Sequence, residues 1–382
     1  MNEKNYDIII IGGGLIGLAF AKGLKQALPE LSMAVIEEKL PIANKRVSAI
    51  NRASQRFLND LGVWSVISKP SPYRRMKVWD QCSRGSIEFE SNDLAQSELG
   101  FIVENEAITS ALRENLRGID WLCPLRLINL REDKDGIILQ AEDDRTFKAP
   151  LVVGADGAHS WLRTQLNIPQ KSWDYHQSAI IATVETQVPH DQTARQCFLP
   201  TGPLAFLPLS NPHHSSIVWS TTESDRLCAL SDEEFGKELT NIFGKFTGDV
   251  KPLDPRRAFP LTMRHADYYV REHVALIGDA IHTIHPLAGQ GLNLGFQDAR
   301  CLIETLAKAH VKHPNLGRLL TLRSYERARK GENWQMIAAM EGLKRLFSCD
   351  TRPVNMMRGL GLTAVNHCGP VKRLLIKRAM GI

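Results

Sequence analysis

The chain has 382 residues, of which 43% are hydrophobic and 23% charged, which is ordinary for a globular protein with room for two domains. The net charge of +5 is too small to indicate nucleic-acid binding, and no apolar run of about 18 residues predicts a membrane-spanning helix. The seven cysteines form no Cys-x-x-Cys pair, which argues against a zinc or disulfide framework and favours a cytoplasmic protein.

The first pattern in chain order is a glycine-rich turn between a strand and a helix. Residues 6–11 predict a buried strand, a helix is expected from Leu18 to about Ala27, and a second strand over residues 33–36. The start leads straight into a strand, so we expect no signal peptide. Such a turn lets a pyrophosphate approach the backbone and lets helix and strand pack. Its glycines are Gly12, Gly14 and Gly17.

The second strand ends at an acidic pair that can bind a ribose. Glu37 follows Gly17 by 20 residues, a spacing at which a carboxylate accepts hydrogen bonds from an adenosine ribose. Glu38 is the competitor, although the register at the strand end favours Glu37. The whole pattern fits either FAD or NAD.

The next segments predict a change of domain. Residues 70–72 (Pro-Ser-Pro) indicate a boundary, and residues 76–80 and 86–90 alternate as half-exposed strands. Residues 99–105 then lead into a helix at about 106–116. Asn105 is either functional or a cap of that helix.

A second strand-and-turn motif follows a predicted strand pair over residues 136–150. Residues 151–153 indicate a buried strand that ends at Gly154-Ala155-Asp156-Gly157. Asp156 is placed either to touch a cofactor or to brace the turn, and we favour the cofactor region. Beyond it, residues 173–269 are dominated by strand patterns typical of an antiparallel sheet, interrupted by a helical insertion over 223–248. His213 and His214 have no third partner at ligand spacing, so we predict no metal site.

The densest motif begins after a predicted buried strand over residues 273–277. Gly278-Asp279 comes first, His285-Pro286 follows at a turn, and helical patterning resumes at about Leu292. Glycines this close to a helix start let backbone N–H groups face an electron-rich ligand. A tight turn without a ligand is the simpler alternative, but such a turn does not need Gly289, Gly291 and Gly295 within seven residues.

The run from Gly278-Asp279 through His-Pro-Leu-Ala-Gly-Gln-Gly-Leu-Asn-Leu-Gly-Phe-Gln-Asp resembles the ubiquinone-biosynthesis hydroxylases. These are FAD-dependent aromatic monooxygenases of the para-hydroxybenzoate hydroxylase type. The resemblance covers nearly the whole chain and decides for FAD over NAD. It implies NAD(P)H as a transient electron donor, molecular oxygen as co-substrate, and a prenylated phenol or quinol whose ring is hydroxylated through a flavin hydroperoxide. Alternatives are hydroxylation of a different aromatic compound, reduction of a prenyl chain, and a non-catalytic flavoprotein scaffold in a biosynthetic complex.

The resemblance also implies roles for individual residues. Arg46 matches an arginine beside the flavin and its phosphates, and Asp279 is expected on the ribityl–pyrophosphate part. Pro286 is expected against the ring system, while His285 either helps proton movement or, as we favour, is a structural partner. The cofactor residues predicted overall are Gly12, Gly14, Gly17, Glu37, Arg46, Asp156, Gly157, Gly278, Asp279, Gly289, Gly291, Leu292 and Asn293.

The expected fold is α/β, with a Rossmann-like FAD-binding domain, an inserted and mainly antiparallel substrate domain, and a helical C-terminus. The FAD-binding domain is assigned to 1–75, 105–172 and 270–340, and the substrate domain to 76–104 and 173–269. Residues 341–382 form the C-terminal helical segment, whose basic, amphipathic end at 371–378 either contacts an anionic membrane face or packs as an ordinary terminal helix.

Overall fold

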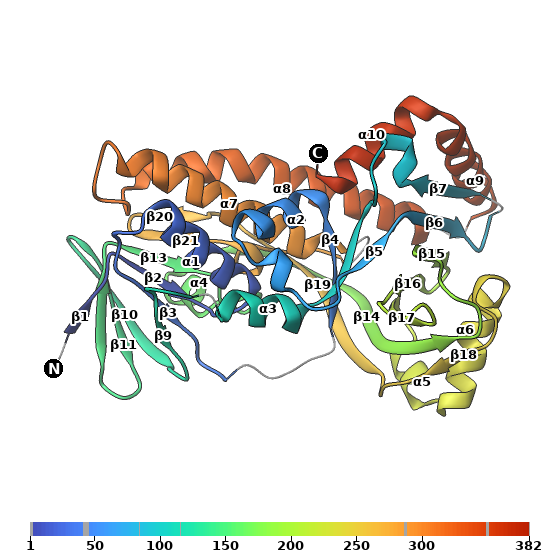
Figure 1. Cartoon of the computed structure of the whole chain (residues 1–382), viewed down its shortest axis with the longest axis horizontal. Coiled ribbons are helices and arrows are strands. Elements are labelled where there is room, and N and C mark those ends of the chain that lie inside the picture. Colours follow the sequence, from blue (N-terminus) through green and yellow to red (C-terminus); the bar gives the residue numbers. More distant parts are fainter. Residues whose placement is uncertain are drawn as a thin grey trace.

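The computed structural model describes residues 3–40, 46–83, 85–114, 116–285, 289–348 and 351–381. The chain forms two bodies side by side, one built on a parallel sheet and one on an antiparallel sheet (Figure 1). Long helices from the C-terminal third run along both bodies. These arrangements confirm the predicted α/β class, the antiparallel sheet and the helical C-terminus.

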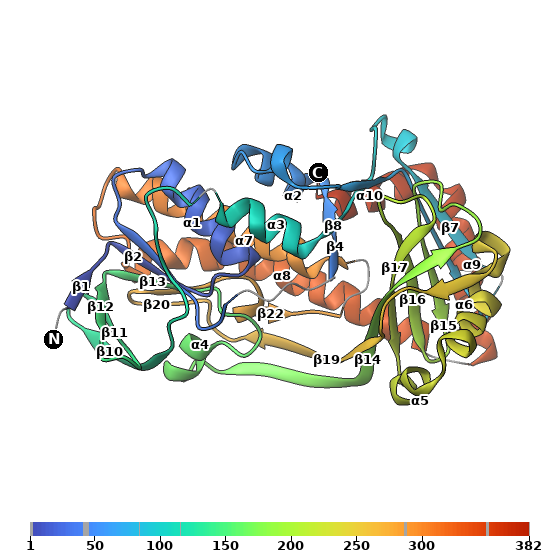
Figure 2. The ribbon, with the colours of Figure 1, turned by 60° about the horizontal axis from the view of Figure 1, so that its bottom comes forward.

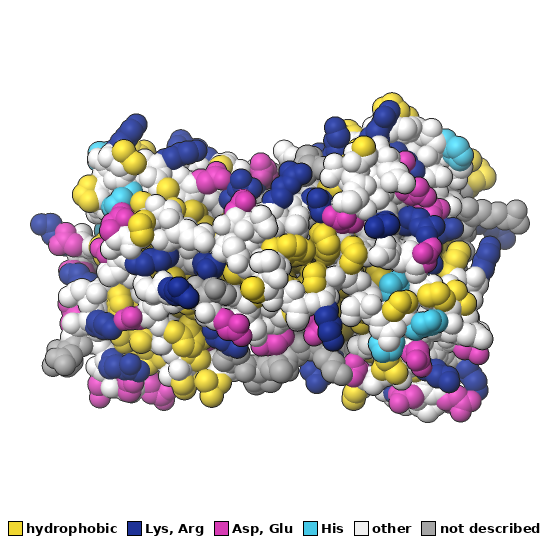
Figure 3. Space-filling model, viewed as in Figure 1, with side chains coloured by type: hydrophobic (Ala, Val, Ile, Leu, Met, Phe, Trp, Pro, Cys, Tyr) yellow, Lys and Arg dark blue, Asp and Glu magenta, His cyan; other side chains and the backbone are white. Residues whose placement is uncertain are grey.

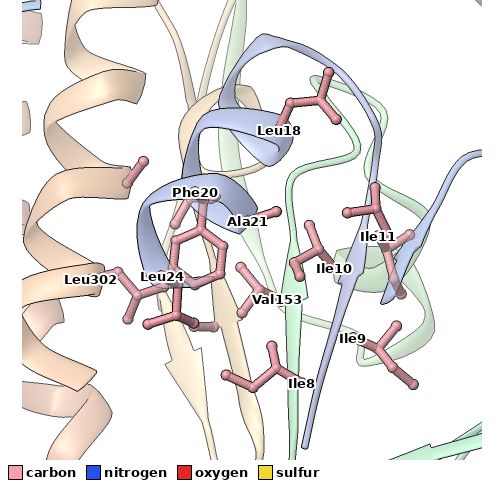
Figure 4. Packing of buried hydrophobic residues seen from close by; sticks show 14 of the residues in the cluster. Ile8, Ile9, Ile10, Ile11, Leu18, Phe20, Ala21, Leu24, Val153 and Leu302 are labelled. Atoms are coloured by element: carbon pink, nitrogen blue, oxygen red, sulfur yellow. The ribbon is translucent and has the colours of Figure 1, made fainter. Parts of the chain in front are cut away.

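The first body is built on a sheet with the strand order β20-β21-β13-β2-β3-β9. All four residues of β2 are isoleucines and all are buried, as suits a central strand covered on both faces. Figure 4 shows Ile8 and Ile10 facing helix α1, and Ile9 and Ile11 facing away from it. The elements are β2 (Ile8–Ile11), α1 (Leu15–Ala27), β3 (Met33–Ile36), β9 (Asp120–Leu122), β13 (Leu151–Gly154), α4 (Trp161–Gln165), β20 (Val270–Arg271), β21 (Val274–Leu276) and α7 (Gly291–His310).

The second body is a larger sheet with the order β22-β19-β14-β17-β16-β15-β6-β7, and β18 also pairs with β14. Its pairs are antiparallel except for β15 with β6. Helix α6 covers one face with Phe235 and Phe243, and the Phe243 ring stacks on that of Phe206 at 4.3 Å. The elements are β6 (Arg75–Asp80), β7 (Ser86–Glu90), β14 (Gln170–Thr186), β15 (Thr193–Leu199), β16 (Gly202–Pro208), β17 (His214–Thr221), α5 (Ser224–Ala229), α6 (Asp232–Thr247), β18 (Val250–Pro252), β19 (Arg257–Ala266) and β22 (His282–Thr283).

Two long strands run from one body into the other. Strand β14 has 17 residues and pairs with β19 from Gln170 to Ile181, with an irregularity between Asp174 and Ser178. Figure 2 shows both strands along the lower edge of the molecule, from α4 to the far sheet. The two bodies are therefore joined by a hydrogen-bonded ladder with one irregularity.

Smaller sheets and the last helices complete the fold. The C-terminal helices pack on the second body, where the Arg358 Nε donates to Asp80 Oδ2 at 2.7 Å and both side chains are buried. Within the described ranges no helix is long and apolar enough to cross a membrane. The remaining elements are β1 (Glu3–Asn5), β4 (Val47–Asn51), α2 (Arg52–Asp60), β5 (Ser71–Tyr73), β8 (Gly100–Glu104), α3 (Asn105–Arg113), β10 (Leu127–Asp133), β11 (Gly136–Ala141), β12 (Thr146–Ala149), α8 (Leu319–Ser348), α9 (Arg352–His367), α10 (Gly369–Met380) and the 3₁₀ turns η1 (Trp64–Val66), η2 (Ser91–Leu94) and η3 (Gly278–Ala280).

Candidate cofactor and substrate site

A cavity of about 680 Å³ lies between the two bodies. Hydrophobic side chains gather in the middle of the face shown in Figure 3, between the bodies. The cavity wall on the parallel-sheet side is made by turns, and on the other side by strands β14 to β17 and β19. Its described lining includes Gly14, Arg46, Asn105, Gly157, Asp279, Gly289, Gly291, Leu292, Ala179, Ile181, Ala205, Leu207, Val218, Phe259, Leu375, Ile376, Ala379 and Met380.

The three predicted glycines of the first turn do different things. Gly12 has a φ of +104°, and a Cβ there would lie 2.4 Å from the Ala155 carbonyl oxygen, so two turns of the sheet touch at this glycine. A Cβ on Gly17 would lie 2.0 Å from the Gly12 oxygen, which holds helix α1 close to the strand. Gly14 instead faces the cavity, and a Cβ there would meet nothing within 4 Å.

Two helix starts face this cavity without a side-chain cap. Gly14 is the N-cap residue of α1 and Gln290 that of α7, and in neither case does a side chain cap the helix. The first N–H groups of an α-helix have no partner within the helix. Both helix starts therefore offer donors and a positive dipole end to an anionic or electron-rich ligand.

The two acidic candidates at the end of β3 point to different places. The Gly13 N–H donates to Glu37 Oε2 at 2.7 Å, so this carboxylate lies against the glycine turn. Glu38 instead pairs with Arg126 at 3.6 Å on an exposed surface. This geometry favours Glu37 for the ribose of a bound dinucleotide.

The turn after β21 brings Asp279 into the cavity. Gly278 has a φ of +61° and donates its N–H to Asp298 Oδ2 at 3.3 Å. Asp279 is exposed and lines the cavity, where desolvation by the surrounding protein raises the pKa of the carboxyl, against the opposing effect of His282 and Arg46. The two residues that sequence reasoning placed near the phosphates, Arg46 and Asp279, therefore lie close enough to interact.

The start of α7 is fixed to strand β4 by one side chain. Asn293 donates from Nδ2 to the Ala49 carbonyl at 2.8 Å and accepts the Asn51 N–H at 3.0 Å. Its amide is therefore used within the protein, and only its backbone remains for a ligand. Gly289, Gly291 and Leu292 line the cavity.

In the Asp156-Gly157 turn, the first residue braces the turn and the second lines the cavity. Asp156 Oδ2 accepts the Leu162 N–H at 3.1 Å, and burial raises the pKa of this carboxyl. Gly157, with a φ of +82°, lines the cavity. The bracing role that we weighed for Asp156 is thus present, and Gly157 is the residue of the turn that lines the cavity.

His285 lies outside the large cavity and is buried. Its Nε2 is 3.4 Å from Gln177 Oε1, and the ring packs edge-on against Tyr175 with centroids 4.9 Å apart. Burial, with a contribution from Lys344, lowers the pKa of His285 to about 4, so the ring is neutral at pH 7. This environment fits a structural partner better than a proton donor. Pro286 lies outside the described residues.

Sequence reasoning missed a buried polar cluster under the Gly278 turn. His282 Nε2 donates to Asp298 Oδ2 at 2.6 Å, and Arg329 Nε donates to Asp298 Oδ1 at 2.8 Å. Burial would raise the pKa of Asp298, but His282 and Arg329 outweigh it and hold the pKa below its usual value. A signal existed, because Asp298 lies four residues from both Leu294 and Leu302 on the buried face of α7.

Asn105 is a second residue whose importance was underestimated. It does not cap the helix: Glu104 is the N-cap residue of α3, and no side chain caps it. Asn105 Oδ1 instead accepts a hydrogen bond from Ser48 at 2.7 Å, and the residue lines the cavity. The capping alternative is therefore wrong in this structure.

The fold and the site are those of a flavoprotein with a dinucleotide-binding domain. The glycine-rich turns of that domain line the same cavity as the antiparallel sheet. The whole chain matches the structure of a p-nitrophenol 4-monooxygenase from Pseudomonas putida with a TM-score of 0.80 at 15% identity, covering 100% of this chain and 99% of that one. That likeness is one of fold.

Sequence relatives identify the family. Residues 5–339 match the model of the FAD binding domain family. A ubiquinone hydroxylase of Rhodospirillum rubrum is 38% identical over 99% of this chain and 90% of its own length. The 3-demethoxyubiquinol 3-hydroxylase of Escherichia coli is 35% identical over the full length of both. The chain belongs to this family of FAD-dependent aromatic-ring monooxygenases, in which NAD(P)H supplies electrons to the flavin.

The residues present fit FAD. Gly14 leaves open space where a pyrophosphate must approach the backbone, and two uncapped helix starts face the same cavity. Arg46 lies close enough to Asp279 to affect its pKa, so a cation stands at the same end of the cavity.

Proposed function

We propose that this enzyme hydroxylates the aromatic ring of a prenylated phenol or quinol intermediate in ubiquinone biosynthesis. The observation that carries the proposal is the composition of the cavity beyond the cofactor turns. Ile181, Leu207 and Val218 line it on the sheet side, and Ile376 and Met380 line it near the C-terminus. Such a wall suits a ring that carries an apolar chain. The names of the relatives in Rhodospirillum rubrum and Escherichia coli support the same pathway.

We assign the cofactor residues by what faces the cavity. Bound FAD, once reduced, would activate molecular oxygen and transfer one oxygen atom to the ring. The N–H groups at the start of α7, near Gly291 and Leu292, stabilise negative charge on the reduced flavin. Gly14 and Arg46 hold the phosphates, Asp279 the ribityl–pyrophosphate part, and Glu37 the ribose. Gly12, Gly17 and Gly278 shape the turns, and Gly157 borders the flavin.

We assign cofactor binding and substrate binding to the segments predicted from the sequence. We propose that residues 1–75, 105–172 and 270–340 bind FAD, and that 76–104 and 173–269 form the substrate wall. The segment 341–382 closes the far end of the cavity. The apolar wall excludes water from the reacting ring, which protects the activated oxygen from wasteful release. We place the enzyme in the cytoplasm, at most peripheral to the inner face of the membrane.

The experiment that tests this is mass spectrometry of the quinones that accumulate when the gene is deleted in its own host. We expect a prenylated phenol or quinol that lacks one ring oxygen, and the missing oxygen identifies the carbon. Purified enzyme with NAD(P)H and labelled oxygen gas should then put the label into the product. An unchanged quinone pool together with no labelled product would reject the pathway.

A flavin-free variant separates enzyme from scaffold. Asp279→Ala should release FAD and abolish complementation of the deletion strain. If the variant loses flavin but restores the full quinone pool, the protein acts as a non-catalytic scaffold instead. If deletion changes no quinone but the enzyme labels another aromatic compound, the substrate lies outside the pathway.

A further inference from the structure

The last helix has one side inside the molecule and lines the far end of the cavity. Ile376 and Met380 of α10 are buried against a small cluster that contains Leu99, Met76 and Phe89. All five of these side chains also border the cavity. The wall at this end is therefore apolar, and α10 supplies one side of it.

The outer side of the same helical layer exposes large apolar side chains. On α10, Leu374 is 65% exposed, and on the neighbouring α9, Met356, Met357 and Leu360 are 67%, 71% and 64% exposed. Exposed apolar residues are common singly, but here they gather on two adjoining helices at one end of the molecule (Figure 1). We call Met356, Met357, Leu360, Arg373, Leu374 and Lys377 the tail surface.

The C-terminal segment that contains α9 and α10 is basic, although Arg358 and Lys372 within it are paired with Asp80 and Asp93. Residues 342–382 contain eight Lys and Arg residues and one Asp, a net charge of +7, although the whole chain carries only +5. The other residues therefore carry a net charge of −2. Arg373 and Lys377 are exposed beside Leu374. Cations that border exposed apolar side chains complement a bilayer with anionic head groups, since the former meet phosphates and the latter enter the interface.

We propose that the tail surface docks onto an anionic lipid bilayer, so that the apolar end of the cavity beside α10 takes up the tail of a lipid-soluble substrate from it. The uptake part rests on the proposed function, whereas docking itself does not. A protein partner would need acidic groups to match the cations, and no helix of the described chain would have to enter the bilayer core.

Vesicle flotation of the FAD-loaded, full-length protein tests docking without any turnover. We expect binding to vesicles of phosphatidylcholine mixed with phosphatidylglycerol, and much weaker binding to phosphatidylcholine alone. Each Lys or Arg near an anionic surface strengthens binding about fivefold. The double variant Arg373→Glu, Lys377→Glu should therefore weaken binding by about 25-fold or more.

A matched control makes the same charge change elsewhere. Lys308 and Lys312 are exposed near the end of α7, at the opposite end of the molecule. Lys308→Glu, Lys312→Glu should float like the wild type. Met357→Ser, Leu360→Ser should weaken flotation without changing net charge. If the control variant loses as much vesicle binding as the tail-surface variant, binding depends only on the net charge of the protein, and the proposal is overturned.

Turnover distinguishes docking from the proposed function. The Arg373→Glu, Lys377→Glu variant should keep wild-type turnover of a short-chain, water-soluble phenol and lose turnover of a long-chain substrate in vesicles. Loss of both would show damage to the site rather than loss of docking, and would overturn the proposal. So would a wild type that does not float, or a lipid-free self-association that these variants abolish. Flotation without any ring hydroxylation would retain docking and reject only the proposed function.

Discussion

The two bodies of this enzyme build their walls of the same cavity in opposite ways. On the parallel-sheet side the wall is formed largely by turns, and glycines behind it, such as Gly12 and Gly17, allow the backbone segments to touch. On the antiparallel side the wall is made of side chains, such as Ile181 and Leu207. A backbone wall tolerates almost no added atom, whereas a side-chain wall can be refitted by substitution. We therefore propose that the first side fixes the cofactor and the second can vary with the substrate.

The largest expected effect comes from comparing alanine substitutions at two glycines of the first turn, Gly17 and Gly14. Gly17→Ala places a Cβ 2.0 Å from a carbonyl oxygen, so we expect a loss of roughly 3 kcal/mol or more in unfolding free energy and no retained FAD. Gly14→Ala meets no protein atom within 4 Å. It should keep the unfolding free energy and weaken FAD binding by about tenfold. Denaturant unfolding of the apoprotein and flavin fluorescence titration measure both, and equal stability losses would contradict the assignment.

A comparable loss of stability in the second body should leave FAD binding intact. Arg358→Met removes the partner of the buried Asp80 carboxylate, which costs about 3–5 kcal/mol. We expect α9 and α10 to become sensitive to protease while purified protein keeps its flavin. Arg345→Met, which removes an exposed pair with Glu341, is the control and should cost less than about 1 kcal/mol. Loss of flavin from Arg358→Met would show that the two bodies are not independent in this respect.

Acid should destabilise the folded enzyme through a buried histidine that lies outside the cavity. His285 is neutral when folded because its pKa is lowered to about 4, whereas an unfolded histidine titrates near 6.5. Its stabilising effect is therefore complete above about pH 6.5 and falls as the pH drops toward 4, by about 2 kcal/mol at pH 5. His285→Gln should lose this share of the pH dependence. The exposed His159→Gln variant should keep it, and identical pH profiles for His285→Gln and wild type would refute the argument.

The smallest expected effect concerns the contact between β4 and α3. Ser48→Ala removes the hydrogen bond to Asn105 Oδ1, which costs about 1 kcal/mol. Because Asn105 lines the cavity, the Michaelis constant for substrate or NAD(P)H should change while unfolding changes little. Ser110→Ala, which removes a weaker side-chain bond to Glu106 on the same helix, is the control for helix stability alone. Unchanged kinetics in Ser48→Ala would exclude a positioning role for Asn105.

The backbone side could be predicted from the sequence because its constraints are local. Glycine spacing, strand ends and helix starts are close together in the chain, so Gly12, Gly14, Gly17 and the Gly278-Asp279 turn were found without a structure. The helix limits were less certain: α1 begins at Leu15 rather than Leu18, because Gly14 is its N-cap residue and Gly17 belongs to its first turn.

The rest depends on contacts between distant segments. Asp298, His282 and Arg329 meet only when α7, α8 and β22 pack together, so the helical pattern of α7 indicates a buried Asp298 but not its two partners. The role of Asn105 was misjudged for the same reason, because its partner Ser48 is 57 residues away. The apolar end of the cavity likewise brings Leu99 next to Met380, and the hydrophobic periodicity of the sequence cannot predict a contact between such distant residues.

The pairing of β14 with β19 has a consequence for how the enzyme can move. The paired segments on both sides of the irregularity at residues 174–178 hold the two bodies together, so we expect the two walls to move little relative to each other. We therefore do not expect the substrate to enter through a large separation of the two bodies. We expect any shift during a catalytic cycle to be local, for example in a helix such as α10, whose buried side packs through Ile376 and Met380.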